Sequence, residues 1–538
     1  MSVRFRILAA DPLAKEGVAL LRDDPDFELT EKFGQSEDEL AACIGEYDAV
    51  IVRSGVRISA GVLNSPGRLR MIARAGVGVD NIDLAAATAA GVIVLNTPDA
   101  NTLSTAEHTM AIMLGLARRI PQAHAHVAGG GWERSRFKGV QLAGKTLGVI
   151  GFGRIGRAVA ARALALDMSV IAHDPLVRDR AALGGRVRLC ETLETLLGEA
   201  DVITLHAAVT PQTRHLIDAA ALKRMKPSAM LINCARGELV DEAALAAAIR
   251  EGRLAGAGVD VYSSEPPRDN PLIGLEHVLH TPHLGASTVE AQRAVSVDAV
   301  RGVIAFCRDG VVRNAVNIVD LPHDLSPRDQ VWVDVADRVG RMLAPLCAHG
   351  VSCVRLIVHG ESLGRLSMWL GRHVMVRLLE QHLSGPMGVV NVLEQAAERA
   401  IAFEATTAPG EGESLTVEIE TPEGRHTIEA ALGERGRPRI RLFDGHALDM
   451  SLEGHMVVVA NQDTPGAIGL VATAFGDAGV NIADLAVSRR GSEAMMVLKV
   501  DKHAPPNVLD DLRSRSPTIR DVWTAELPPI PSAEANAP

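Results

Sequence analysis

Three short segments of the chain contain side chains that could move a proton beside a bound anion. Arg236 lies in the segment NCARG, Glu265 stands before two prolines, and His283 lies in the segment PHLGAST. Oxidation of a hydroxyl next to a carboxylate needs a cation for the carboxylate, a base for the hydroxyl proton and a group that orients the base. Arginine, histidine and glutamate meet these needs. Any one of the three is more often structural, so it is their combination that predicts a catalytic group.

A glycine-rich turn indicates a second kind of chemistry, the binding of a dinucleotide. Gly151, Gly153 and Gly156 follow the apolar run 146–150 and precede a helical stretch. The first glycine permits a tight turn, the second lets the backbone approach a pyrophosphate, and the third lets the helix pack closely on the strand. Asp174 ends the next apolar run, where its carboxylate would bind ribose hydroxyls and repel a 2′-phosphate. The pattern therefore predicts NAD rather than NADP; the alternative is a packing turn with a solvated aspartate.

Two series of apolar runs, separated by alanine-rich helical stretches, must position these groups. Continuous runs are typical of parallel strands buried on both faces, with the helices as crossovers. The sequence thus predicts an α/β fold with two doubly wound parallel-sheet units. Ligands of such sheets bind outside the carboxyl ends of the strands, so the catalytic segments, which each end a run, should face one crevice. The runs are 5–9, 49–53, 70–74 and 92–95, then 146–151, 169–174, 201–206, 229–234, 256–261 and 278–282.

Two long helices are expected to connect the units. Residues 101–119 read as one helix with a capping box of Ser104 and Glu107, and residues 287–308 would return the chain to the first unit. The expected domains are a discontinuous substrate-binding unit (1–100 and 287–319), a Rossmann-type NAD unit (101–286), an α+β intervening unit (320–452), a ferredoxin-like unit (453–527) and a disordered tail (528–538).

The pattern changes after residue 320. Residues 331–349 are expected to form a helix and residues 352–359 a strand, and alternating runs within 415–442 are broken by turn residues, which predicts β-hairpins. The last unit reads strand, helix, strand, strand, helix, strand over 456–526. This βαββαβ order is ferredoxin-like.

Composition excludes several other classes of protein. The 538 residues are too many for one hydrophobic core, and 47% hydrophobic with 22% charged residues is the balance of a globular protein. The net charge of −11 argues against a nucleic-acid partner. No apolar run is long enough for a membrane span. The six cysteines show no zinc-ligand spacing, so we expect no metal site and a cytoplasmic protein with reduced thiols.

The segments quoted above resemble those of one family, the D-isomer-specific 2-hydroxyacid dehydrogenases. The resemblance covers essentially all of residues 1–320 and keeps the order of the motifs. It implies that His283 is the acid/base, that Glu265 holds its imidazole, and that Arg236 binds the substrate carboxylate. It also implies NAD as the cofactor, with Asp260 near the nicotinamide amide. The residues then expected at the cofactor are Gly151, Gly153, Arg154, Ile155, Gly156, Asp174, His206, Cys234, Ala235, Asp260 and Gly285.

Further arginines indicate which member of the family this resembles. Arg53 and Arg74 each follow a predicted strand, and their loops are similar to those of the phosphoglycerate-oxidising branch. That resemblance implies D-3-phosphoglycerate as substrate, oxidised to 3-phosphohydroxypyruvate in the first step of serine biosynthesis. The alternative is that these arginines are solvated. The implied substrate contacts are Arg53, Ser54, Gly55 and Arg74, with Trp132 and Arg134 reaching in from a neighbouring subunit.

The C-terminal unit resembles an ACT domain, a regulatory module that binds amino acids at subunit interfaces. Asn461, Asp463 and Asn481 lie at positions that receive the ligand in serine-regulated relatives. The resemblance implies L-serine as an effector and a homodimer or homotetramer. Asn and Asp also favour turns, so a purely structural role is the alternative.

Two other functions compete with this interpretation. A hydroxypyruvate or glyoxylate reductase of the same family would need neither a regulatory extension nor phosphate-binding arginines. A non-catalytic NAD-sensing protein, like the C-terminal-binding-protein corepressors, shares the fold and the catalytic residues but has no ACT module.

Overall fold

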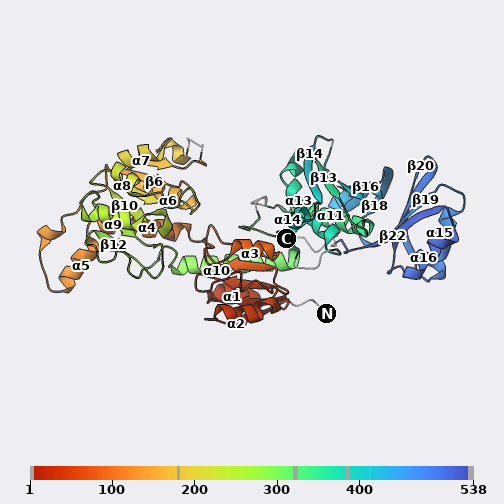
Figure 1. Cartoon of the computed structure of the whole chain (residues 1–538), viewed down its shortest axis with the longest axis horizontal. Coiled ribbons are helices and arrows are strands. Elements are labelled where there is room, and N and C mark those ends of the chain that lie inside the picture. Colours follow the sequence, from red (N-terminus) through yellow and green to blue (C-terminus); the bar gives the residue numbers. More distant parts are fainter. Residues whose placement is uncertain (1–4, 178–181, 319–324, 383–386, 411, 531–538) are drawn as a thin grey trace.

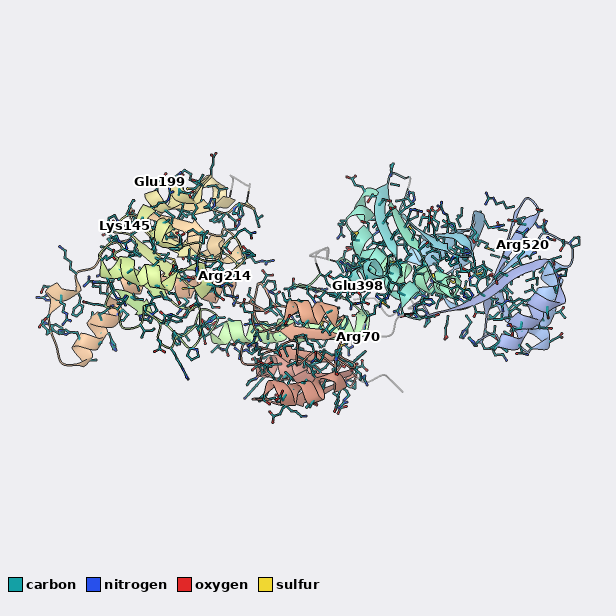
Figure 2. The ribbon with its side chains drawn as sticks, viewed as in Figure 1. Arg70, Lys145, Glu199, Arg214, Glu398 and Arg520 are labelled. Atoms are coloured by element: carbon teal, nitrogen blue, oxygen red, sulfur yellow. The ribbon has the colours of Figure 1, made fainter. Side chains whose placement is uncertain are left out.

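The computed structural model describes residues 5–177, 182–318, 325–382, 387–410 and 412–530. Figure 1 shows four sheets, each with its own helices, and each unit is named below after its sheet. The five-stranded and seven-stranded units lie in the N-terminal part of the chain, and the six-stranded and four-stranded units follow them. In Figure 2, charged side chains such as Arg70, Glu199, Glu398 and Arg520 lie on all four units.

The five-stranded sheet is entirely parallel, with strand order β2-β1-β3-β4-β5. The runs that form β1, β3, β4 and β5 were predicted. Strand β2 was not, because its mixed sequence FELTE is buried at only one position. The elements are β1 (Phe5–Ala9), α1 (Lys15–Arg22), β2 (Phe27–Glu31), α2 (Glu37–Cys43), β3 (Ala49–Val52), β4 (Met71–Arg74), α3 (Leu84–Ala89) and β5 (Ile93–Leu95).

The seven-stranded sheet is also parallel and has the order β12-β11-β10-β9-β6-β7-β8. The strand order reverses between β6 and β9, and in doubly wound sheets this switch point opens the ligand crevice. The strands are β6 (Thr146–Ile150), β7 (Ser169–His173), β8 (Val187–Leu189), β9 (Val202–Leu205), β10 (Met230–Asn233), β11 (Gly256–Val259) and β12 (Val278–His280). The helices are α4 (Thr102–Ala117), α5 (Ile120–Ala128), α6 (Arg154–Ala165), α7 (Leu193–Glu199), α8 (Ala219–Arg224) and α9 (Glu242–Arg250).

The first connecting helix differs from its prediction at both ends. α4 begins at Thr102, and the Ser104 hydroxyl donates to the Asn101 carbonyl instead of capping the helix. Glu107, the other member of the expected capping box, accepts a hydrogen bond from Arg162 of α6 at 3.2 Å. Arg119 then adopts a left-handed conformation (φ 52°), which separates α4 from α5. Tertiary contacts thus override the local capping pattern.

The second connecting helix, α10 (Val289–Asp309), confirms the predicted return to the five-stranded unit. Thr288 caps its start by accepting from the Ala291 N–H, and Gly310 ends it at φ 65°. α10 packs against α1, where a Cβ on Gly17 would lie 3.0 Å from the backbone of Ser296. Figure 1 shows α10 beside α3 and α1, beneath the other units.

The six-stranded sheet has the order β14-β13-β15-β16-β17-β18, antiparallel except for the parallel pair β13 and β14. The hairpins predicted within 415–442 are confirmed, whereas α13 and β14 were not predicted. The elements are α11 (Pro327–Leu343), β13 (Cys353–His359), α12 (Glu361–Gly364), α13 (Ser367–Leu379), α14 (Val392–Glu398), β14 (Ala402–Ala408), β15 (Ser414–Thr421), β16 (Gly424–Leu432), β17 (Pro438–Phe443) and β18 (His446–Ser451).

The four-stranded unit confirms the βαββαβ prediction, with strand order β20-β21-β19-β22 and antiparallel pairs. The α/β fold class with an added ferredoxin-like unit is therefore confirmed. Most of the predicted disordered tail, residues 531–538, lies outside the described residues. Among the described helices, none is long and apolar enough to cross a membrane. The elements are β19 (Gly454–Gln462), α15 (Ala467–Asp477), β20 (Ile482–Arg490), β21 (Glu493–Val500), α16 (Pro506–Arg515) and β22 (Ile519–Leu527).

Candidate active site

His283 and Glu265 form a hydrogen-bonded pair after the last strands of the seven-stranded sheet. Nδ1 of His283 lies 2.8 Å from Oε2 of Glu265, and both side chains remain partly exposed. The hydrogen bond that His283 donates to Glu265 raises the pKa of His283 against the opposing effect of burial. Burial would raise the pKa of Glu265, but the bond from His283 outweighs it and lowers that pKa. Glu265 therefore orients the imidazole ring by binding Nδ1, which leaves Nε2 to act as the base.

Asp260 fixes the loop that presents this histidine. The residue is 0% exposed, and its carboxylate accepts hydrogen bonds from the N–H groups of Leu284 (2.7 Å) and Gly285 (2.9 Å). His108 of α4 (3.0 Å) and Thr281 (2.5 Å) also bond to it. Burial alone would raise the pKa of Asp260, but these hydrogen bonds lower it to about 2.

Asp260 was predicted to lie near the nicotinamide amide, and that role stays a prediction. In this structure its buried carboxylate binds the loop that carries His283. The N–H of His283 donates to the Asp260 carbonyl at 2.8 Å, and His283 has a left-handed backbone (φ 55°), which is unusual for a side chain of its kind. Asp260 therefore positions His283 and Gly285 through the loop.

Arg236 extends from the seven-stranded unit to the five-stranded unit. Its Nε donates to Asp80 at 2.9 Å, and its Nη1 donates to the Ala235 carbonyl at 2.7 Å. Asn233 supports the turn by donating to the Arg236 carbonyl at 2.9 Å. A Cβ on Gly78 would lie 1.9 Å from Nη2 of Arg236, so a larger residue there would displace the guanidinium from this position. This arginine thus connects the two units through its bond to Asp80.

Two more cations come from the carboxyl ends of β3 and β4. The Nε of Arg74 is buried and has no hydrogen-bond partner among the described residues. Burial, together with the charge of Arg236 and the weaker effect of Arg53, lowers the pKa of Arg74 to about 10, although Asp80 and Asp11 oppose this. Buried, unpaired positive charge is costly without an anion. The structure therefore assembles a site with the electrostatics of an anion receptor.

The loop after β3 is anchored by hydrogen bonds on both sides. Asp11 accepts from the N–H groups of Arg53 (2.6 Å) and Val56 (3.2 Å), and Asn81 donates to the Arg53 carbonyl at 2.7 Å. Between these anchors, the N–H groups of Ser54 and Gly55 donate to no described residue and are exposed. Sequence reasoning missed Asp11, Asn81 and Asp80, since each acts from a distant loop.

The glycine turn has the shape that a dinucleotide requires. A Cβ on Gly151 would lie 2.6 Å from the His206 backbone, and one on Gly156 would lie 2.2 Å from the Gly151 carbonyl oxygen. Gly153 faces open space at the start of α6. Asp174 accepts from the Phe152 N–H at 2.8 Å, which places its carboxylate at the turn. These residues fit NAD, with the α6 N-terminus facing the pyrophosphate.

The remaining predicted cofactor residues differ in exposure. Arg154 pairs with Asp99 at 2.5 Å in this conformation, and Ile155 packs partly against the core of the seven-stranded unit. Burial lowers the pKa of His206 to about 3, so its ring is neutral, and Nε2 bonds to Thr204 at 3.0 Å. Burial raises the pKa of Cys234 to about 12, which makes this thiol unreactive.

Trp132 and Arg134 are not brought to this site within one chain. They follow α5, which projects away from the other units in Figure 1, and Trp132 is 78% exposed. α5 has no buried residue, and Ile120 and Val127 on it are exposed as well. Exposed apolar surface of this kind is typical of surfaces that contact another protein.

The three predicted effector residues also do not meet in one chain. Asn461 pairs with Ala494 at one end of β19, whereas Ile482, next to Asn481, pairs with Val500 at the other end. Asp463 forms an ion pair with Arg489 at 3.3 Å, and the buried amide of Asn461 donates to the Gln462 carbonyl. A ligand site that uses Asp463 and Asn481 together therefore requires a second subunit.

Comparisons with known proteins agree with this geometry. Residues 110–285 match the model of the D-isomer specific 2-hydroxyacid dehydrogenase NAD binding domain, and residues 455–516 match the ACT domain. The fold and the site thus define an NAD-dependent dehydrogenase of the D-isomer-specific 2-hydroxyacid class. D-3-phosphoglycerate dehydrogenase of Methanocaldococcus jannaschii is 37% identical over 526 residues, 97% of this chain and 100% of that protein. The Bacillus subtilis enzyme is 35% identical over 532 residues, with 97% and 100% covered. The chain belongs to the D-3-phosphoglycerate dehydrogenase family, as the sequence motifs predicted.

Two similar solved structures each cover somewhat more than half of this chain. The TT0316 protein from Thermus thermophilus is 36% identical with a TM-score of 0.53, covering 58% of this chain and 99% of that protein. A glyoxylate reductase from Paecilomyes thermophila is 29% identical with a TM-score of 0.54, covering 59% and 99%. Both therefore lack a counterpart to a large part of this chain.

Replacing Asp174 by alanine should weaken NAD binding and relax selectivity toward NADP, because the carboxylate that would bind ribose and repel a 2′-phosphate is lost. Titration of both cofactors by fluorescence would measure the change. Glu199→Gln, an exposed acid on the same unit in Figure 2, is the matched control. Unchanged affinity for both cofactors in the Asp174 variant would exclude the ribose assignment.

Proposed function

We propose that the protein oxidises D-3-phosphoglycerate to 3-phosphohydroxypyruvate with NAD, the first step of serine biosynthesis. The observation that carries the proposal is the buried Nε of Arg74, which has no hydrogen-bond partner among the described residues, beside the charges of Arg236 and Arg53. A substrate with a carboxylate and a phosphate at opposite ends would neutralise all three. The full-length similarity to relatives named D-3-phosphoglycerate dehydrogenase supports it.

In this proposal each group has one task. Arg236 binds the carboxylate, while Arg53, Arg74 and the N–H groups of Ser54 and Gly55 bind the phosphate. Nε2 of His283 accepts the proton of the C2 hydroxyl, and Glu265 stabilises the imidazolium through Nδ1. When bound, NAD accepts the hydride. Trp132 and Arg134 of a neighbouring subunit would close the phosphate end.

The test is NADH formation with D-3-phosphoglycerate under product trapping, compared with D-glycerate and 2-hydroxyglutarate. Preference for phosphoglycerate supports the proposal. Turnover of D-glycerate alone would favour a hydroxypyruvate or glyoxylate reductase, and tight NAD binding without any turnover would favour an NAD-sensing protein. Neither rival accounts for the six-stranded and four-stranded units.

The pH dependence of this reaction should report His283. Because Glu265 raises the pKa of His283, the base stays protonated to a higher pH than an ordinary histidine. Oxidation should therefore rise with pH through a pKa above 6.5, the ordinary value. In Glu265→Gln that acid limb should move to lower pH while the maximum falls. A kcat/KM profile checks this, and an unmoved limb in the variant would show that another group titrates.

We also propose that L-serine binds between the four-stranded units of two subunits, in a homodimer or homotetramer. Asn461, Asp463 and Asn481 supply polar groups for the ligand. The segment with the exposed Trp132 supplies a second contact between the subunits. Loss of activity on adding L-serine, together with the mass of the assembly by light scattering, tests both parts. The free cysteines suit a cytoplasmic location. We further propose that the chain divides into a substrate-binding unit (1–100 and 287–319), an NAD unit (101–286), an intervening unit (320–452), a ferredoxin-like unit (453–527) and a tail (528–538).

A further inference from the structure

The four-stranded unit brings together two imidazoles and a carboxylate from three separate segments. His455 lies on β19, Glu526 on β22, and His503 in the loop between β21 and α16. One donor atom of each lies within 4.8 Å of the other two. Figure 1 places β19, β22 and α16 together at one end of the molecule, away from the dehydrogenase units.

Sheet register explains why the three meet. His455 and Glu526 are direct partners across β19 and β22, so their Cβ atoms are about 5 Å apart. Val457 and Val522 belong to the core beneath α15 and α16. Because side chains alternate along a strand, His455 and Glu526 lie on that same helix-covered face. His503 enters at its open edge, so that the cluster sits at the rim of the layer, where His503 and Glu526 are exposed.

The cluster makes none of the bonds that would otherwise explain it. Across the described residues, no hydrogen bond or ion pair joins the side chain of His455, His503 or Glu526 to any other group. Nδ1 of His455 is moreover buried without a hydrogen-bond partner, which is costly for a polar atom. The rings of the two histidines are 6.1 Å apart at 80°, so they do not stack in parallel.

We propose that His455, His503 and Glu526 bind a divalent transition-metal ion of the zinc type. Two imidazoles and one carboxylate are a ligand set that zinc uses when a further position is left to water. Imidazole favours Zn²⁺, Co²⁺, Ni²⁺ and Cu²⁺ over Mg²⁺ and Ca²⁺, which prefer oxygen ligands. Tetrahedral bonds of about 2.0–2.1 Å place ligand atoms about 3.3 Å apart, and small rotations of the exposed side chains supply the required contraction.

The site would connect to the rest of the chain through the ends of the four-stranded unit. Arg338 of α11, which is 1% exposed, donates to the carbonyls of Leu452 and Pro528, just before β19 and just after β22. Asp501, close to His503 in sequence, accepts from the Asn481 N–H at 3.1 Å. A bound ion would therefore hold β19 to β22 where the unit joins α11, and beside one proposed effector residue.

The experiment uses the tag-free full-length protein, stripped of metal with a chelator and dialysed. Zn²⁺ is titrated against a chromophoric chelator, and Co²⁺ is added separately to record its visible absorption. Wild-type protein should bind one equivalent that millimolar Mg²⁺ does not displace. Each of His503→Ala, His455→Ala and Glu526→Gln should weaken it by about tenfold or more, since even partners outside the ligand set contribute about 10–100-fold.

His349→Ala is the matched control, because that side chain is 76% exposed on the six-stranded unit and its Nε2 lies 4.0 Å from Oε1 of Glu423. It should bind metal as the wild type does. Zn²⁺ should also raise the Tm of the wild type and not that of His503→Ala. His503 and Glu526 are exposed, so their variants should fold even if His455→Ala does not. Equal affinity in wild type, His503→Ala and Glu526→Gln, or no binding by the wild type, would overturn the proposal. Because binding and Tm are read directly, the result is independent of the proposed enzymatic function.

Discussion

His283→Ala should lower kcat by about 10²–10⁴-fold while leaving NAD affinity nearly unchanged, since general acid–base catalysis has that magnitude. The loop that carries His283 is held by Asp260 through backbone N–H groups, which alanine at position 283 leaves in place. Alanine adopts the left-handed backbone of position 283 at a higher energetic cost, which should lower the Tm of the variant. The Tm is therefore measured together with kcat.

Steady-state oxidation of D-3-phosphoglycerate and NAD titration together check this prediction. His277→Ala is the control, a histidine of the same stretch that lines a cavity of about 440 Å³ beside α5 instead of the crevice. Its kcat should stay near that of the wild type. Loss of NAD binding in parallel with kcat would show that His283 is structural and that the base lies elsewhere.

The pairing of His283 with Glu265 could be predicted from sequence because the topology of the sheet brings their two segments together. Glu265 follows β11 and His283 follows β12, and the carboxyl ends of parallel strands lie at one edge of the sheet. The glycine turn was predictable for the same reason, since its strand-to-helix setting is local. The fold class of the dehydrogenase part therefore required no long-range information, whereas the order of its strands was not predicted.

The supporting residues could not be predicted, because they act from segments far away in sequence. Asp80 meets Arg236 only after the two units come together, and His108 reaches Asp260 from a helix that precedes it by 152 positions. Asp260 stays a predicted cofactor contact, and its hydrogen bonds to the N–H groups of Leu284 and Gly285 could not be read from the sequence. Spacing along the chain likewise indicated no metal site, whereas sheet register places His455 beside Glu526.

Antiparallel register also explains why the effector residues were harder to interpret. In sequence, Asp463 and Asn481 flank one helix and seem to form one site. In the sheet, they lie at opposite ends of β19, because β20 and β19 both run antiparallel to β21 between them. The regulatory hypothesis therefore depends on the assembly, whereas the substrate hypothesis depends on it only for Trp132 and Arg134.

Arg74→Gln should separate the two ends of the substrate. We expect kcat/KM for D-3-phosphoglycerate to fall about 10–100-fold, because a hydrogen bond to a charged group contributes about 1.5–3 kcal/mol. The value for D-glycerate, which has no phosphate, should change little. Folding should not suffer: burial lowers the pKa of Arg74, so the folded state disfavours its charge at neutral pH, and removing that charge should leave Tm unchanged or raised.

Arg70→Gln is the matched control, since Arg70 precedes the same strand, β4, at its opposite end and stacks over Phe306 at 4.9 Å. Figure 2 shows it on the five-stranded unit. Its loss should cost some stability through the lost cation–π contact and leave the ratio of the two substrates unaltered. Equal losses of kcat/KM for phosphoglycerate and D-glycerate in Arg74→Gln would mean that Arg74 does not bind the phosphate. A lowered Tm with an unchanged ratio would instead make it a structural arginine, and the charge cluster would then need another anion to explain it.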